Sequence, residues 1–100
     1  MMERMVWVIK DDKGNFVHKN SIIKWDSFTS YYVSHKTFSE ECRAYTTKKA
    51  VEIALEHLKL QCEKIRLEVC FEVIQVNLSD IIMDYKGFIG ENMVLVEISV

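Results

Sequence analysis

The chain has 100 residues, of which 49% are hydrophobic and 28% charged, an ordinary composition for one globular domain and not for a disordered one. No apolar run approaches the roughly 18 residues that a membrane span requires, and the first residues lack a signal-peptide cleavage pattern, so we expect a cytoplasmic protein. The net charge is +3 over residues 1–67 and −5 over residues 68–100, which disfavours duplex nucleic acid as a ligand.

The first half of the chain predicts strands. Residues 5–9 form an apolar run, residues 11–15 supply turn-forming side chains, and the apolar pattern then resumes. This spacing predicts a hairpin with a loop of about five residues, in which Gly14 takes a positive φ. Residues 27–33 alternate as a half-buried strand would, and residues 43–45 predict a further short strand.

Residues 46–65 predict the one main helix of the chain, because apolar side chains recur there at helical spacing. Thr46 is the predicted N-cap, since its hydroxyl can accept a hydrogen bond from a free amide of the first turn. The predicted buried stripe consists of Ala50, Val51, Ala54, Leu55, Leu58, Cys62 and Ile65.

Two more strands follow the predicted helix. Residues 68–78 alternate, with Phe71 and Val73 on one face and Ile74 and Val76 on the other. Residues 93–100 form a strongly apolar strand at the end of the chain. Between these strands, Ser79 can cap a short helical turn over 81–83, and a glycine-containing loop comes after it.

This order of elements predicts an α+β fold in a single domain that spans residues 1–100. We expect two layers, in which a mostly antiparallel sheet of four to five strands carries the amphipathic helix of about 46–65 on one face. The apolar stripe of that helix is wide enough to lie across several strands.

The sequence lacks the patterns that catalysis or cofactor binding requires. Its three glycines are too scattered for a phosphate-binding loop. The odd number of cysteines fits neither a disulfide framework nor a metal site, and predicts small buried thiols in a reducing cytosol. The residues concerned are Cys42, Cys62 and Cys70, with His18, His35 and His57 also outside any metal-ligand spacing. We therefore expect a protein that is not an enzyme, with no catalytic residue, no metal site and no cofactor.

Residues 24–38, KWDSFTSYYVSHKTF, are the most aromatic stretch of the chain. Most of these rings are expected to fill the core. Rings that point outward can anchor a protein interface at a low cost in side-chain entropy, which makes Trp25, Tyr31 and Tyr32 candidate partner-binding residues. Lysines lie between the aromatic residues, so stacking on single-stranded nucleic acid is the weaker alternative.

Three segments in this order, WVIKDDKGNFVHK, CRAYTTKKAVEIALEHL and FEVIQVNL, resemble small accessory proteins of tailed phages and prophages of low-GC Gram-positive bacteria. The resemblance covers roughly residues 5–78 and is one of pattern, with no catalytic motif. The segment 79–100 departs from it. The resemblance implies a protein of the bacterial cytoplasm that uses no cofactor.

Small phage proteins of this kind commonly bind and block a host protein, and anti-defence inhibitors such as anti-CRISPR proteins are one class. The resemblance therefore implies an inhibitor of a host protein, with a defence nuclease that acts on nucleic acid as the specific class. Clustered carboxylates in the last third could occupy a groove that normally receives phosphates. The acidic candidates for partner binding are Asp80, Asp84, Glu91 and Glu97. The alternative is an assembly module that forms a homodimer by pairing strand 93–100 with a second chain.

Overall fold

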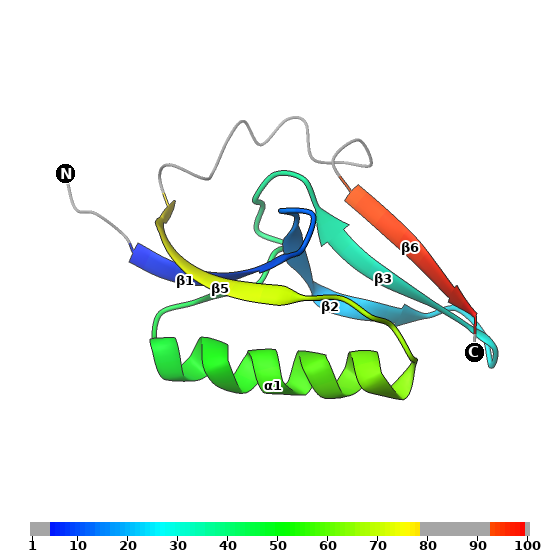
Figure 1. Ribbon diagram of the computed structural model, residues 1–100. Helices are drawn as coiled ribbons and strands as arrows, with labels where there is room; N and C mark the ends of the chain where they lie inside the picture. The colour runs from blue at the N-terminus through cyan, green and yellow to red at the C-terminus, as the bar shows by residue number, and fades with distance from the viewer. Residues whose placement is uncertain (1–4, 79–92, 100) are drawn as a thin grey trace.

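The computed structural model describes residues 5–78 and the backbone of residues 93–99. Its elements are β1 (Met5–Asp11), β2 (Phe16–Lys24), β3 (Thr29–His35), β4 (Ala44–Tyr45), α1 (Lys48–Lys64), β5 (Phe71–Asn77) and β6 (Met93–Ser99). The fold class is α+β as predicted, because one helix packs against an open antiparallel sheet (Figure 1). Five strands have seven or nine residues, and the two-residue β4 is the sixth. The helical turn predicted over 81–83 lies outside the described residues.

β1 pairs with other strands along both of its edges. β5 pairs with β1 along its whole length, from Met5 opposite Asn77 to Asp11 opposite Phe71. The other edge of β1 is divided between two strands. β2 pairs with it only at Lys10, and β4 pairs with it at Trp7 and Val8.

Residues 41–45 fill the space where β1 and β2 separate, and we call them the wedge segment. The backbone N–H of Arg43 donates to the carbonyl of Val17 at 2.9 Å, and that of Lys19 donates to the carbonyl of Glu41 at 2.8 Å. The last two residues of the segment form β4 and pair with β1. The wedge segment therefore joins two strands whose own pairing is nearly absent.

The turn between β1 and β2 forms as the sequence predicts. Gly14 has a φ of 79°, which residues with a side chain adopt only at a cost in energy. The carboxylate of Asp11 accepts hydrogen bonds from the backbone N–H groups of Lys13 and Asn15, both at 2.9 Å. These bonds hold the loop in a fixed shape.

The ends of α1 are fixed by local hydrogen bonds. The N-cap is Thr47, whose hydroxyl accepts from the backbone N–H of Ala50 at 3.2 Å, so the predicted cap at Thr46 is wrong by one residue. At the C-terminal end Arg66 has a φ of 57°. The backbone N–H groups of Arg66 and Leu67 donate to the carbonyls of Glu63 and Cys62, which is the Schellman pattern.

The sheet has a hydrophobic core on each face. The core under the helix consists of Ile9, Val17, Val51, Leu58 and Cys62, with Trp7, Tyr45, Ala54, Leu55, Leu67, Phe71 and Val73 packed against it. The core on the other face consists of Val6, Val8, Phe16, Phe38 and Cys42, with Ile74, Val76 and Leu78 around it. The predicted alternation is thus confirmed over residues 71–78, but the strand begins at Phe71 and not at residue 68. Cys70, however, is exposed, which contradicts the prediction that all three thiols are buried.

The helix covers only part of the sheet. It packs mainly against β1, β4 and β5, while β3 and β6 extend away from it (Figure 1). β3 pairs with β2 on one side and with β6 along its whole length on the other. Within the described residues, no helix is long and apolar enough to cross a membrane.

Candidate partner-binding surface

The turn that joins β2 to β3 presents the most exposed aromatic side chains of the described chain. The Asp26 carboxylate accepts hydrogen bonds from the backbone N–H groups of Phe28 and Thr29, both at 2.7 Å. These two bonds stabilise the charged form and hold the pKa of Asp26 below its ordinary value. The backbone N–H of Trp25 donates to the carbonyl of Thr29 at 3.0 Å and closes the turn. The aromatic residues therefore lie on an ordered turn.

We group four side chains at this end of the hairpin, two of them from the turn or its edge, as the hairpin surface: Ile23, Trp25, Phe28 and Tyr31. Trp25 and Phe28 are each 72% exposed, and Ile23 is 40% exposed. The Trp25 ring meets the Tyr31 ring edge to face, with centroids 5.8 Å apart. Ile23 lies opposite Tyr31 in the pairing of β2 with β3, which places both side chains on one face of the sheet.

The structure brings some of the predicted partner-binding residues together and not others. Trp25 and Tyr31 touch each other, and the backbone of Glu97 lies opposite that of Tyr31 in the pairing of β3 with β6.

Tyr32, a predicted partner-binding residue, is buried and does not belong to this surface. It is only 2% exposed, its hydroxyl donates to the Asp11 carboxylate at 3.3 Å, and its ring packs against Phe71. Burial, together with the negative charge of Asp11, raises the pKa of Tyr32. The three remaining acidic candidates lie outside the described residues: Asp80, Asp84 and Glu91.

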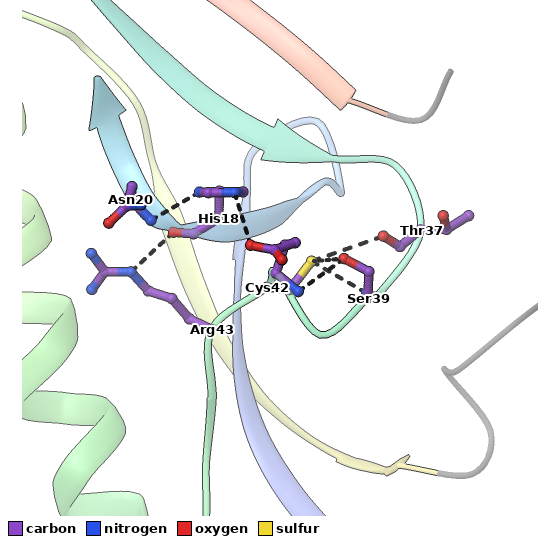
Figure 2. Close-up of polar contacts among 7 residues, drawn as sticks. His18, Asn20, Thr37, Ser39, Cys42 and Arg43 are labelled. Carbon is purple, nitrogen blue, oxygen red and sulfur yellow. Dashed lines mark hydrogen bonds and ion pairs between the residues drawn. The ribbon is translucent and has the colours of Figure 1, made fainter. Parts of the chain in front are cut away.

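A second cluster of polar side chains lies where the wedge segment meets β2 (Figure 2). The His18 Nδ1 accepts from the backbone N–H of Asn20 at 2.8 Å, and its Nε2 lies 3.7 Å from the Glu41 carboxylate. The guanidinium of Arg43 donates to the His18 carbonyl at 3.1 Å. His18 also stacks on the buried ring of His35, with centroids 5.1 Å apart. This pair of histidines was not predictable from the sequence, because the two residues come from different strands.

This cluster is not arranged for nucleophilic catalysis. The Cys42 thiol is buried among Ser39 and the Thr37 carbonyl (Figure 2). Burial raises the pKa of the Cys42 thiol, whereas a nucleophilic cysteine needs a lowered pKa. The described residues also contain no group of three His, Cys, Asp or Glu side chains that could hold a metal ion.

One member of the hairpin surface was missed from the sequence. Phe28 follows Asp26 by two residues, and the hydrogen bond between them puts Phe28 in the turn and not in the strand. An Asp at the start of such a turn commonly caps the amide two residues on, so this local signal was available.

Comparison of the chain with models of known families, with curated proteins and with solved structures finds no match.

Proposed function

We propose that this chain acts by binding another protein through the hairpin surface, without catalysing a reaction. The observation that supports the proposal is the 72% exposure of both Trp25 and Phe28 on a hydrogen-bonded turn. Exposed large aromatic residues are costly in water, and they become anchors when a partner supplies a pocket. Because the turn is already ordered, binding would cost little loop entropy.

The partner in this proposal is a host protein, which the chain inhibits in the bacterial cytoplasm. This part rests on the resemblance to phage accessory proteins, and a nuclease that acts on nucleic acid, as in anti-CRISPR inhibition, is the specific class. The net charge of −5 over residues 68–100 supports that class, because a nucleic-acid groove is basic. Glu97 is the acidic residue whose backbone lies beside the hairpin surface, opposite Tyr31.

The experiment is a tagged pull-down from a nuclease-treated Gram-positive lysate, with the captured protein then assayed for activity. The test variant replaces Trp25 and Phe28 by Ser. The matched control replaces Ile53 and Leu60, which are 52% and 54% exposed on α1, by Ser. Wild type and control should capture one host protein in stoichiometric amount and inhibit it, whereas the hairpin variant should do neither.

The proposal is wrong if the hairpin variant, with an unchanged circular dichroism spectrum, captures and inhibits as wild type does. Loss of capture in the helix control as well would assign the effect to general surface hydrophobicity.

A homodimer is the second candidate, and one observation favours it. Among the described strands β6 pairs with β3 alone and lies at one end of the strand order, where a strand of a second chain could pair with it. Val96→Lys in β6 should then lower the mass in solution measured by light scattering. An unchanged mass would exclude pairing through β6. Salt-sensitive binding of an oligonucleotide that is lost in Tyr31→Ala would instead favour single-stranded nucleic acid.

A further inference from the structure

A pocket of about 140 Å³ lies on the helix side of the sheet, where the chain leaves α1. Its lining comes from three places: the turn between β1 and β2, residues 67–69 after α1, and Tyr32 and Ser34 of β3. The pocket is distinct from the hairpin surface. Tyr31 and Tyr32 are neighbours in β3, so their side chains point to opposite faces of the sheet.

A buried carboxylate lies in the wall of this pocket. Asp11 is 6% exposed, and it accepts hydrogen bonds from two backbone N–H groups and from the Tyr32 hydroxyl. Within the described residues, no lysine or arginine forms an ion pair with it. The groups that contact this carboxylate are therefore hydrogen-bond donors. Two further acids, Asp12 and Glu68, line the same pocket with one lysine, Lys13, so the pocket carries three acids against one basic side chain.

An unpartnered hydroxyl points to the same place. Ser34 is 0% exposed, and its Oγ has no hydrogen-bond partner among the described residues. Ser34 lies two residues after Tyr32, so both side chains are on the pocket side of β3, and both line the pocket. Buried hydroxyl groups are nearly always hydrogen-bonded. This one is available to accept a hydrogen bond from a ligand.

We propose that this pocket binds a primary alkylammonium group. Its N–H donors would reach the Ser34 hydroxyl and the Asp11 and Tyr32 oxygens, and its alkyl chain would lie against Leu67 and Val69. A pocket of 140 Å³ has room for roughly five heavy atoms at the volume that water occupies in the liquid. That is the size of n-butylammonium, which is also the lysine side chain beyond its Cα.

Two other cations fit less well. A guanidinium needs a carboxylate edge with both oxygens free, and both oxygens of Asp11 already accept hydrogen bonds. A metal ion needs a group of ligands that the described residues do not offer. An ammonium has three divergent donors and can use single lone pairs on separate side chains.

The experiment titrates the isotope-labelled full chain with n-butylammonium and with n-butanol, its neutral counterpart, and follows the backbone amides of Ser34 and residues 67–69 by NMR. The ammonium should shift these amides saturably in the millimolar range, and the alcohol should not. Nα-acetyl-lysine amide is the third probe. If it binds as tightly as n-butylammonium, the pocket takes a lysine of a protein, and if it binds much more weakly, the pocket takes a free amine.

Two variants test the assigned contacts. Ser34→Ala and Asp11→Asn should each weaken n-butylammonium binding about tenfold, because each removes an acceptor to a charged donor. Ser34→Ala removes only the hydroxyl, which has no hydrogen-bond partner among the described residues, so the fold should be retained. Glu41→Gln, beside His18 and away from the pocket, should bind as wild type does.

Three results would overturn the inference. They are equal shifts with n-butanol, unchanged affinity in Ser34→Ala, and calcium ions that shift these amides when the amine does not.

Discussion

His35 is a buried imidazole without a hydrogen bond to either ring nitrogen among the described residues. It is 4% exposed, and it stacks on His18. Burial lowers its pKa below the ordinary value of 6.5 and the neighbouring His18 lowers it further, while Glu41 acts in the opposite direction. The folded protein therefore holds His35 neutral at a pH where the unfolded chain already binds a proton.

This difference predicts acid-sensitive stability. The contribution of His35 is present above pH 6.5 and is lost as the pH falls below it, because protons then bind preferentially to the unfolded chain. Urea unfolding at pH 7.5 and pH 5.5 should show a decrease in the free energy of unfolding for wild type. The decrease should be smaller in His35→Gln. His57→Gln, on the exposed side of α1, is the control and should behave as wild type. An equal decrease in His35→Gln would contradict the prediction.

The two neighbouring tyrosines show a limit of sequence analysis at the residue scale. Tyr31 and Tyr32 both lie in an alternating pattern whose two rows are mixed in polarity, so the pattern cannot decide which row is buried. Tyr32 is the buried one of the two because Asp11 and Phe71, from distant parts of the chain, contact it. Cys70 is exposed and lies one residue before β5 begins at Phe71, so the alternation of that strand does not decide its burial.

The N-cap of α1 offers a test at the scale of the element, because two threonines are adjacent. Thr47→Ala should lower the free energy of unfolding by about 1 kcal/mol, since the Ala50 amide loses its acceptor. Thr46→Ala should leave the stability nearly unchanged. Thermal unfolding of both variants measures the difference. A larger loss of unfolding free energy in Thr46→Ala than in Thr47→Ala would show that Thr46 is the N-cap, as the sequence predicts.

The other end of α1 contains a position that favours glycine. Arg66 has a φ of 57°, in the left-handed region that costs a residue with a side chain about 1–2 kcal/mol. Arg66→Gly relieves this strain, but the extra entropy of glycine in the unfolded chain offsets part of the gain. The free energy of unfolding should therefore rise by about 0.5–1 kcal/mol. Arg66→Ala removes the same charge but keeps the strain, so it should give no gain. Equal urea midpoints for the two variants would contradict this account.

The elements themselves were largely predictable, because their signals are local. The turn residues 11–15 and the apolar spacing in 46–65 each depend on neighbours within a few positions. The partners of β1 were not predictable. β5 comes more than sixty residues later, and the wedge segment pairs with two strands at once. No short-range pattern records which strands lie side by side.

At the scale of the whole molecule, the cores and the hairpin surface lie in different parts of the sheet. β1 contributes Val6, Val8 and Ile9 to the two cores, whereas Trp25 and Phe28 contribute to neither. Local opening costs less where few apolar side chains are buried. Backbone amides of residues 22–24 and 29–31 should therefore exchange with deuterium faster than those of β1 and β5. Mass spectrometry after brief exchange measures this order, and slower exchange at the hairpin end would contradict it.

The separation of core from surface also bears on what could be predicted. The candidate surface depends on two things, aromatic composition and exposure. Composition is visible in residues 24–38, but exposure depends on which face of the sheet each ring takes. Tyr32 lies on the helix side and is buried against Asp11 and Phe71, whereas Tyr31 points to the opposite face, and these contacts come from distant parts of the chain.

The divided edge of β1 also determines how the chain can fold. A hairpin that is paired along its length can form early, because its contacts close a short loop, but β1 and β2 share one register pair. β1 acquires its partners only when the wedge segment and β5 arrive, so most of its contacts must wait for long loops to close. During synthesis, β1 therefore remains without a full partner until residue 77 has left the ribosome. We expect refolding on the millisecond-to-second scale typical of sheets with distant contacts, and a dependence on chaperones for nascent chains that end before β5.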